Sequence, residues 1–530
     1  MPAPGSQLTR DLRRLAATYR AERGGAMQAG TGPTGPELLS RRQMLVRGAQ
    51  VGGAGLLAGG AATGSARAGP GPGRAPRIVI VGAGLAGLTC AYRLQQHGLH
   101  AAVYESRPDR VGGRCWSARE FVDRQVAEHG GEFIDTRHVQ LRRLVRELGL
   151  PMDDRIRAQA RERGVDAVLY LDGQPRVRSE VYADFPQVMA RLEADSERVG
   201  DYRYDRATPV AVEFGMRTVR DWLDANVPGG SQSLLGRAIT ISQTGFFGLD
   251  PSELSAINLF EAYTRPYVGA DDRYHVRGGN DRVTRRLAAR LRRGALHLDA
   301  PLRALWRRGD GTLGLHFEGI RRAVLADHVV LCLPFSTLRR VDLARAGLSA
   351  RKRQCIEELG MGTNAKVLLQ FRDRFSHHHH WSGEFSTDQP VSHSWDSSLA
   401  EPGRAGLLTI YSGGPTGESY RSRDPHQPAP RRVVRDSLAT LDRMVPGVSR
   451  AYNGHAWLDA WFRDPWSRGS YAAFLPGQYT RYWGFIGRPE GRIHFGGEHT
   501  STYSQGYLNG GVESGERCAR EVLQAVRARS

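Results

Sequence analysis

The sequence predicts an α/β protein that carries a second, α+β domain. A strand, a tight glycine turn, a helix and a second strand follow one another between residues 77 and 105, which is the pattern of a βαβ unit. Apolar strands of the same kind return far downstream, at residues 328–334 and 492–498, and the second of them leads into a C-terminal helix. The first domain is therefore expected to be assembled from separated segments of the chain.

The chain has 530 residues, which is too long for one simple hydrophobic core. We expect residues 77–135, 271–335 and 481–530 to form the first domain. The two intervening stretches, 136–270 and 336–480, are expected to form the second domain. Residues 1–76 remain outside both and are predicted to be a leader.

The leader contains the pattern of a twin-arginine export signal. Arg41 and Arg42 precede a weakly apolar run rich in Gly and Ala, which ends in the small-x-small sequence Ala66-Arg67-Ala68. This order predicts a signal at about residues 40–68 and an extracellular or cell-envelope location, with a basic tail as the alternative. After residue 70 no stretch is long and apolar enough to span a bilayer.

The glycine turn predicts a Rossmann-type dinucleotide site. Gly82, Gly84 and Gly87 form GxGxxG between a strand and a helix. The first glycine makes the turn, the second lets a pyrophosphate approach the backbone, and the third lets helix and strand pack closely. The amides at the helix start, at Leu85 and Ala86, then face negative charge. Glu105 follows at the spacing expected for a carboxylate on a ribose hydroxyl.

Composition excludes several other classes of function. The net charge is +19, but the arginines are scattered and no basic run is interleaved with aromatic residues, so we expect no nucleic-acid partner. The five cysteines are far apart and form no CxxC pair, which indicates core thiols. The tract His377–His380 has no accompanying ligand pattern, so we expect a solvated loop and no metal.

Lysine is almost absent from the chain, because 72 of the 74 Lys and Arg residues are arginine. A lysine ammonium is more compact than a guanidinium and can lose its proton when buried. Lys366, in NAKVLLQF, therefore indicates a chemical requirement, with a surface lysine on an edge strand as the alternative. Lys352, in the polar stretch ARKRQ, is expected at the surface.

Several motifs taken in order resemble the flavin-containing amine oxidase superfamily, which includes monoamine oxidases, polyamine oxidases, L-amino-acid oxidases and bacterial nicotine oxidoreductase. The motifs are GAGLAGL, Glu105, VGGR, GGEFID, RGGND, NAKVLLQF, SYAAFLP and FGGEHTSTYSQGYLNGGVESGERCA. The resemblance covers residues 77–527 and implies an FAD-binding domain of the GR2-like flavoprotein fold. In the relatives with covalent flavin a cysteine stands where this chain has Ser470, so we expect non-covalent FAD.

The resemblance implies a set of cofactor contacts. FAD would lie along the glycine turn, with Arg114 near the pyrophosphate, the backbone of 130–133 beside the isoalloxazine, and Glu498 toward the ribityl chain. The implied cofactor-binding residues are Gly82, Gly84, Leu85, Ala86, Gly87, Glu105, Gly113, Arg114, Gly130, Gly131, Glu132, Phe133, Leu302, Gly497, Glu498, Gly506, Tyr507 and Leu508.

The resemblance also implies three catalytic positions. Lys366 matches the lysine that holds a water against flavin N5, and Tyr471 and Tyr507 match the two aromatic side chains that flank the substrate amine. Facing rings exclude water and present electron-rich faces to the amine. Trp461 and Phe474 are expected to extend this apolar wall.

The expected reaction is oxidative deamination of a primary amine or an L-amino acid. Hydride would pass to FAD, oxygen would become H2O2, and the imine would hydrolyse to a carbonyl compound and ammonia. Phe133 stands where many L-amino-acid oxidases carry a carboxylate-binding arginine, which favours amines unless another arginine substitutes. Glu132 and Asp135 are open to two interpretations, a site for a distal cation or structural caps.

Two alternatives stay open. One is a dehydrogenase or desaturase-like flavoenzyme, acting for example on basic L-amino acids, that uses an acceptor other than oxygen. The other is a non-catalytic binding protein, because Rab GDP-dissociation inhibitors share this fold. The expected partners are the small amine and O2, with no stable membrane span, and the chain is expected to act alone or as a homodimer.

Overall fold

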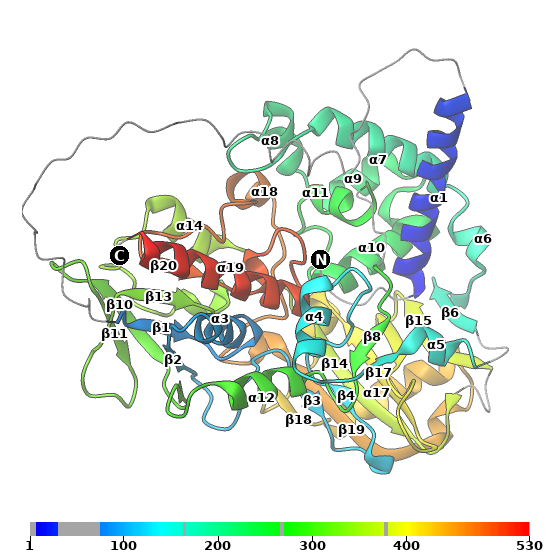
Figure 1. Cartoon of the computed structure of the whole chain (residues 1–530). Coiled ribbons are helices and arrows are strands. Elements are labelled where there is room, and N and C mark those ends of the chain that lie inside the picture. The colour runs from blue at the N-terminus through cyan, green and yellow to red at the C-terminus, as the bar shows by residue number, and fades with distance from the viewer. Residues whose placement is uncertain (1–6, 30–74, 163–165, 265–269, 376–379, 529–530) are drawn as a thin grey trace, which may run out of the picture.

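The computed structural model describes residues 7–29, 75–162, 166–264, 270–375 and 380–528. Two large sheets form the body of the molecule (Figure 1). A five-stranded sheet with its helices lies on one side, and an eight-stranded sheet covered by a group of helices lies on the other. The fold is α/β, as the sequence predicts.

The five-stranded sheet is parallel and has the order β20-β13-β1-β2-β9. It is built from chain segments as far apart as residues 78–81 and 493–495, as the separated motifs predict. Its strands are β1 (Ile78–Val81), β2 (Ala101–Tyr104), β9 (Leu296–His297), β13 (His328–Leu331) and β20 (Ile493–Phe495).

Both faces of this sheet are buried, which explains why β1 is apolar throughout. Ile78 and Ile80 face a core shared with the helices α3 (Leu85–Gln96), α4 (Val139–Glu147), α12 (Asp281–Arg290) and α19 (Leu508–Arg527). The alternate residues Val79 and Val81 face the opposite core, which includes a three-stranded antiparallel sheet of β10 (Leu302–Arg307), β11 (Leu313–Phe317) and β12 (Val324–Ala326).

The eight-stranded sheet has the order β18-β19-β14-β17-β16-β15-β6-β7, and only the pair β15–β6 is parallel. Its strands are β6 (Asp166–Leu171), β7 (Gln174–Pro175), β14 (Ala365–Phe371), β15 (Trp381–Thr387), β16 (His393–Asp396), β17 (Gly406–Ser412), β18 (His426–Pro428) and β19 (Tyr452–Ala460). One face packs on α17 (Arg431–Met444) through an apolar core that includes Val367, Leu369 and Ile410. The other face carries the polar residues of the site.

The remaining elements complete the two parts. Two small ribbons pair β3 (Ser117–Ala118) with β4 (Ala127–Glu128) and β5 (Met152–Asp154) with β8 (Tyr274–Val276). The other helices are α5 (Arg155–Gln159), α6 (Arg178–Val181), α7 (Phe185–Val199), α8 (Pro209–Gly215), α9 (Val219–Asn226), α10 (Leu234–Phe247), α11 (Ile257–Leu259), α13 (Phe335–Leu338), α14 (Ala350–Glu358), α16 (Gly414–Ser419) and α18 (Gln478–Tyr482).

The N-terminal segment contains a helix that the sequence analysis did not predict. Helix α1 (Gln7–Ala29) packs beside α7 and α10, at one edge of the eight-stranded sheet (Figure 1). The predicted export signal at 40–68 lies outside the described residues. The domain boundaries stay a prediction, although the strands of the two large sheets fall in the segments that the sequence assigns to the first and the second domain, respectively.

The sequence predicts Lys352 at the surface, and this prediction is wrong. Its side chain is fully buried, and its ammonium donates to the carbonyls of Ile486 and Arg488 at 2.7 and 3.0 Å. It also lies 4.1 Å from the ring centroid of Phe495. Burial lowers the pKa of Lys352 to about 8. A polar sequence context on α14 could not reveal that these carbonyls converge on one face of the helix.

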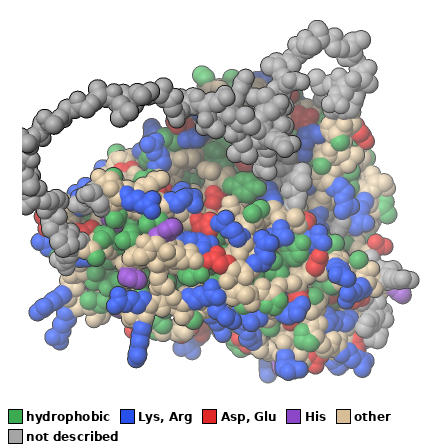
Figure 2. Space-filling model, viewed as in Figure 1, with side chains coloured by type: hydrophobic (Ala, Val, Ile, Leu, Met, Phe, Trp, Pro, Cys, Tyr) green, Lys and Arg blue, Asp and Glu red, His purple; other side chains and the backbone are tan. Residues whose placement is uncertain are grey.

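Other expectations on single residues have mixed outcomes. The five cysteines are free, and four are buried while Cys332 is partly buried, as core thiols would be. The histidine tract lies mostly outside the described residues. In the described part of the chain, no helix is long and apolar enough to cross a membrane. Lys and Arg side chains are scattered over the face of the molecule in Figure 2.

The glycine turn generates a test of the fold. A Cβ added at Gly87 would lie 2.0 Å from the Gly82 carbonyl oxygen, so Gly87→Ala must push α3 away from β1. We expect a loss of stability of about 3 kcal/mol, the upper part of the range for overpacking. Gly84→Ala is the matched control, because its Cβ would have no atom closer than 3.9 Å and its φ of −75° suits alanine. Equal melting temperatures for the two variants would contradict this packing.

Candidate functional site

One cavity connects the glycine turn at the end of β1 with Lys366 on β14. It begins where parallel strands end, because Gly82 follows β1, Glu105 follows β2, Cys332 follows β13 and Gly497 follows β20. The carboxyl ends of parallel strands are where open α/β sheets bind ligands. Its wall combines backbone amides, a few polar side chains and aromatic rings, which is the usual make-up of a small-molecule or cofactor site.

Eighteen residues predicted from the sequence come together on the wall of this cavity. They are Gly82, Gly84, Leu85, Ala86, Glu105, Gly113, Arg114, Gly130, Gly131, Glu132, Phe133, Lys366, Tyr471, Gly497, Glu498, Gly506, Tyr507 and Leu508. Two predicted residues lie elsewhere. Gly87 packs against β1, and Leu302 begins β10 in the core behind the sheet. Of the two additional aromatic residues, Trp461 lines the cavity, whereas Phe474 stacks on Tyr479 with ring centroids 4.2 Å apart.

The glycine turn has the geometry of an anion site. Gly82 has φ of +99°, which favours glycine, and Gly84 caps α3 without any side-chain hydrogen bond. Helix α19 also begins at the cavity, after Tyr507, without a side-chain cap. The amides and dipoles of two helix N-termini therefore favour negative charge in the cavity. The phosphates of a dinucleotide fit the first of these positions.

Glu105 holds the loops around the turn. Its carboxylate accepts hydrogen bonds from the backbone amides of Ala83 at 2.8 Å and Arg107 at 3.0 Å. The side chain lines the cavity, where a ribose would meet it. Its contact with a ribose stays a prediction.

Arg114 and Glu498 join the glycine-turn end of the cavity to the segment that carries Tyr471. Arg114 donates to the Ser470 carbonyl at 2.6 Å and to the Glu498 carboxylate at 3.0 Å. Glu498 also accepts the backbone N–H of Ala472 at 3.2 Å and of Gly506 at 2.7 Å. One carboxylate thus fixes the backbone next to both predicted tyrosines, Tyr471 and Tyr507.

Lys366 is buried, with 4% of its side chain exposed, and all three of its N–H donors have acceptors. They are the carbonyls of Glu128 and Gly130, both at 2.8 Å, and the Glu132 carboxylate at 2.9 Å. This arrangement excludes the alternative of a surface lysine. Its role in holding a water stays a prediction, and it requires one of these three bonds to be exchanged.

Glu132 is the carboxylate partner of Lys366. Its other oxygen accepts the Trp395 indole N–H and the Ser397 hydroxyl, each at 2.8 Å. Burial on its own would raise the pKa of Glu132, but the charges of Lys366 and Arg155 lower it below its ordinary value. Of the two interpretations left open for this residue, the structure shows an internal cation, Lys366, bound to it.

Lys366 belongs to a row of residues that crosses the eight-stranded sheet. His393, Tyr411, Lys366, Asp459 and His426 stand opposite one another on β16, β17, β14, β19 and β18. Residues paired in this way point to the same face of a sheet. The pairing of strands therefore places Tyr411, which the sequence analysis missed, beside Lys366 on the cavity wall.

Four buried aromatic side chains pack together at this end of the cavity, and we call them the aromatic chamber: Phe133, Trp395, Tyr411 and Tyr471. Three of them, Phe133, Tyr411 and Tyr471, line the cavity. The Tyr471 hydroxyl donates to the Gly245 carbonyl at 3.1 Å, so the Tyr411 hydroxyl, 2.7 Å away, donates to Tyr471. Burial raises the pKa of both hydroxyls well above the ordinary value, which keeps them neutral. The four side chains of the chamber thus carry no charge themselves, although the Lys366–Glu132 ion pair adjoins Trp395.

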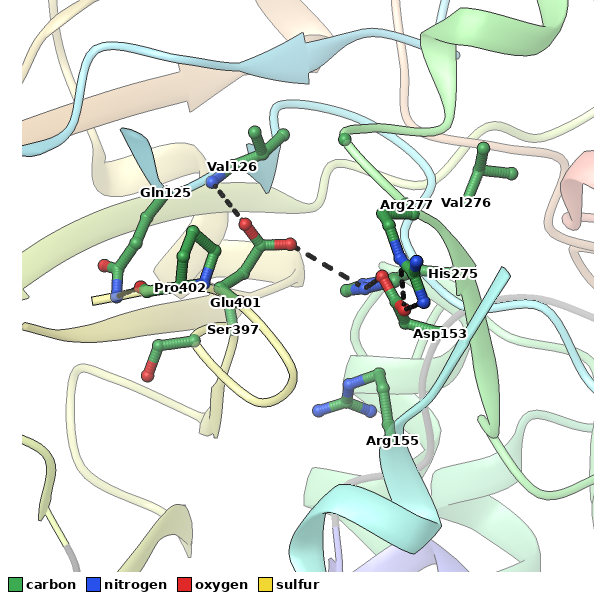
Figure 3. Close-up of polar contacts among 12 residues, drawn as sticks. Gln125, Val126, Asp153, Arg155, His275, Val276, Arg277, Ser397, Glu401 and Pro402 are labelled. Atoms are coloured by element: carbon green, nitrogen blue, oxygen red, sulfur yellow. Dashed lines mark hydrogen bonds and ion pairs between the residues drawn. The ribbon is translucent and has the colours of Figure 1, made fainter. Parts of the chain in front are cut away.

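Arg155 lies behind the chamber. Its guanidinium carbon is 4.2 Å from the ring centroid of Phe133, and it donates to the carbonyls of Asp272 and Asp396 at 3.3 and 3.1 Å. Figure 3 shows Arg155 beside a second cluster, in which His275 lies 3.6 Å from Asp153 and 3.8 Å from Glu401. This cluster connects the β5–β8 ribbon to the loop that follows β16.

On the other side of Lys366 two histidines and two aspartates continue the row, and we call them the histidine relay: His129, His426, Asp459 and Asp464. The His129 ring nitrogen Nδ1 lies 2.9 Å from Asp459, and His426 bridges Asp459 at 2.7 Å and Asp464 at 3.0 Å. Trp461 donates to the His129 carbonyl at 2.8 Å. Among the described residues, no three His, Cys, Asp or Glu side chains gather as metal ligands.

Comparison with known proteins agrees with this geometry. A family model described as flavin containing amine oxidoreductase matches residues 85–523. Flavin-containing amine oxidase A of Canis lupus familiaris is 25% identical over 476 residues, covering 85% of each chain. L-amino-acid oxidase of Mus musculus is 26% identical over 475 residues, covering 84% of this chain and 70% of that protein.

A solved structure of putrescine oxidase bound to putrescine superposes on this chain with a TM-score of 0.71 and 22% identity. The match covers 85% of this chain and 99% of that one. At this identity the likeness shows the fold.

The histidine relay generates a prediction for pH dependence. Burial would lower the pKa of His129, but Asp459 and Glu120 raise it to about 9. The protonated ring then contributes about 3 kcal/mol of stability. This contribution is fully present below the unfolded pKa, near 6.5, and is lost as the pH rises through about 9. We expect the melting temperature of the wild type to exceed that of His129→Gln most at pH 6 and least above pH 9.5. A difference that grows with pH would contradict this assignment.

Proposed function

Because the chain belongs to the family of flavin-containing amine oxidoreductases, we propose that it binds FAD without a covalent bond and deaminates a primary amine or an L-amino acid. Hydride leaves the carbon beside the nitrogen for the flavin, O2 is reduced to H2O2, and the imine hydrolyses to a carbonyl compound and ammonia. The observation that carries this proposal is the single cavity that runs from a dinucleotide turn to an aromatic chamber beside a buried lysine.

FAD, when bound, supplies the redox chemistry, and the protein supplies position and electrostatics. The glycine turn and the α3 N-terminus would hold its diphosphate, with Glu105 at the ribose. The amide of Leu508 at the α19 N-terminus would meet its far end, where its partial positive charge favours an electron-rich ring. Ser470 supports non-covalent binding, because its hydroxyl cannot form the thioether of the covalent relatives and donates to Asn364 at 2.7 Å.

The aromatic chamber prepares the amine for oxidation. An amine must lose its proton before its neighbouring carbon can release hydride, and buried aromatic side chains without charge favour the neutral amine. The hydrogen bond from Tyr411 holds the Tyr471 hydroxyl in place. The Tyr471 ring is therefore oriented by a neutral partner that adds no charge to the site. Tyr507 lines the same cavity, and its hydroxyl is kept neutral because burial raises its pKa.

The wall of the cavity favours an amine over an amino acid. Phe133 lines the cavity at the position where an arginine would bind a carboxylate, and Arg155 lies behind its ring. Two of the Arg155 N–H groups already donate to backbone carbonyls. An amino-acid substrate would require this ring to move, and Arg155 is the observation that supports that second candidate.

Export and assembly are further parts of the proposal. Arg41 and Arg42 support export by the twin-arginine route, which carries folded proteins and suits an enzyme that takes up its cofactor first. A homodimer stays an expectation.

The reaction can be tested with the purified full-length flavoprotein under air. We would add separate pools of primary amines, polyamines and L-amino acids and measure H2O2 and ammonia released per substrate consumed. One H2O2 and one ammonia per molecule of a primary amine are expected. Turnover that needs an artificial acceptor and gives no peroxide would replace the oxidase with a dehydrogenase.

Lys366 generates a prediction on catalysis. In Lys366→Arg the charge remains, but a planar fork cannot reach the three acceptors that surround the ammonium. We expect kcat to fall about 10²-fold to 10³-fold, the usual loss for one preorganised donor. Flavin content should stay near that of the wild type, and absorbance measures it. Wild-type kcat in this variant would show that Lys366 serves only to hold the fold together.

A further inference from the structure

Helix α1 packs against a surface of the second domain, and we call this surface its seat. It contacts α7, α10, β15 and the π-helical turn Phe260–Thr264. Leu8, Leu12 and Ala16, spaced four residues apart, are fully buried. The Thr9 hydroxyl lies 2.9 Å from that of Ser242 on α10.

Charged contacts hold the same face of α1. The Arg10 guanidinium forms a hydrogen-bonded ion pair with Glu384 on β15 and lies 3.8 Å from the Asp272 carboxylate. Asp11 accepts a hydrogen bond from Arg178 at 2.8 Å. Glu384 and Asp272 are themselves buried, so they depend on a cation close by.

Two chains of contacts link this part of the molecule to the aromatic chamber. The Asp272 carbonyl accepts from Arg155, which stacks on Phe133 of the chamber. Arg13 lies 4.2 Å over the Phe246 ring, and the preceding residue, Gly245, accepts the Tyr471 hydroxyl. Helix α1 therefore brings the positive charges of Arg10 and Arg13 to the outer wall of the proposed substrate site.

A polar pocket adjoins one side of the helix. Its wall includes Asp11, Arg14 and Arg178. The chain that follows, residues 30–74, contains the predicted export signal and its small-x-small end. Cleavage anywhere in these residues would separate α1 from β1 covalently.

We propose that α1 is a releasable intramolecular cap on the substrate domain. While it is seated, Arg10 pairs with Glu384 and lies beside Asp272. After cleavage within residues 30–74 the cap dissociates, and the two carboxylates attract the cationic group of the substrate toward the chamber. This cap rests on the proposed function for its biological meaning, but its release and the binding of a cation to its seat are measurable without turnover.

The test uses the full-length flavoprotein with a specific protease site inserted between residues 30 and 74. Mass spectrometry after gel filtration shows whether the N-terminal fragment has left. Calorimetry then measures the Kd of n-propylguanidine, which has the atoms of the arginine side chain and no free amine. We expect the Kd to fall at least tenfold after α1 is removed.

Matched variants show whether Arg10 and Glu384 carry the effect. In the uncut protein Arg10→Ala should lower the Kd of n-propylguanidine at least fivefold. Arg14→Ala removes the same charge from an exposed position on the same helix and should leave Kd unchanged. In the cut protein Glu384→Gln should abolish the gain in n-propylguanidine affinity that follows the removal of α1.

Two results would overturn the cap. One is a fragment that stays bound after cleavage even in Arg10→Ala, and the other is an unchanged Kd once the fragment has gone. A protein that gains n-propylguanidine affinity on cleavage but oxidises no amine would keep the cap and reject the proposed function.

Discussion

The buried ammonium of Lys366 is the interaction on which the site depends. A charge in a protein interior is tolerated only when it is paired and its donors are satisfied. Lys366 meets this requirement through one carboxylate and two carbonyls of the segment 128–132, which belongs to the other part of the molecule. The eight-stranded sheet is thereby held against the cofactor end of the cavity, and the aromatic chamber is positioned between them.

The two sheets divide the chemistry between them. The parallel sheet presents loops and helix N-termini at the ends of its strands, where backbone amides favour an anionic cofactor. The antiparallel sheet presents a row of side chains across neighbouring strands, so that Tyr411, Lys366 and Asp459 occupy one face at fixed spacing. Arg114 and Glu498 connect the two arrangements through the backbone of Ser470, Ala472 and Gly506. A cofactor between the sheets would therefore meet a preorganised wall on both sides.

The sequence could predict the parts of the site that are local. The glycine turn, Glu105 and the motif around Glu498 carry their geometry in residues that are close together in the chain, and all of them line the cavity. The sequence could not predict contacts that depend on strand pairing, such as Tyr411 beside Lys366 or Trp395 against Glu132. Helix α1 was missed because its polar composition hid a buried stripe of only Leu8, Leu12 and Ala16, and Lys352 was misplaced because the carbonyls that bind it lie in residues 485–488.

Under the proposed function, a flavin in this cavity takes hydride from an amine held in the aromatic chamber. Anaerobic titration of the purified yellow protein with a diamine, followed at the flavin absorbance band, tests this step most directly. We expect bleaching by one equivalent of amine, and recovery of the band when air is admitted. A flavin that no amine bleaches in the absence of oxygen would contradict it.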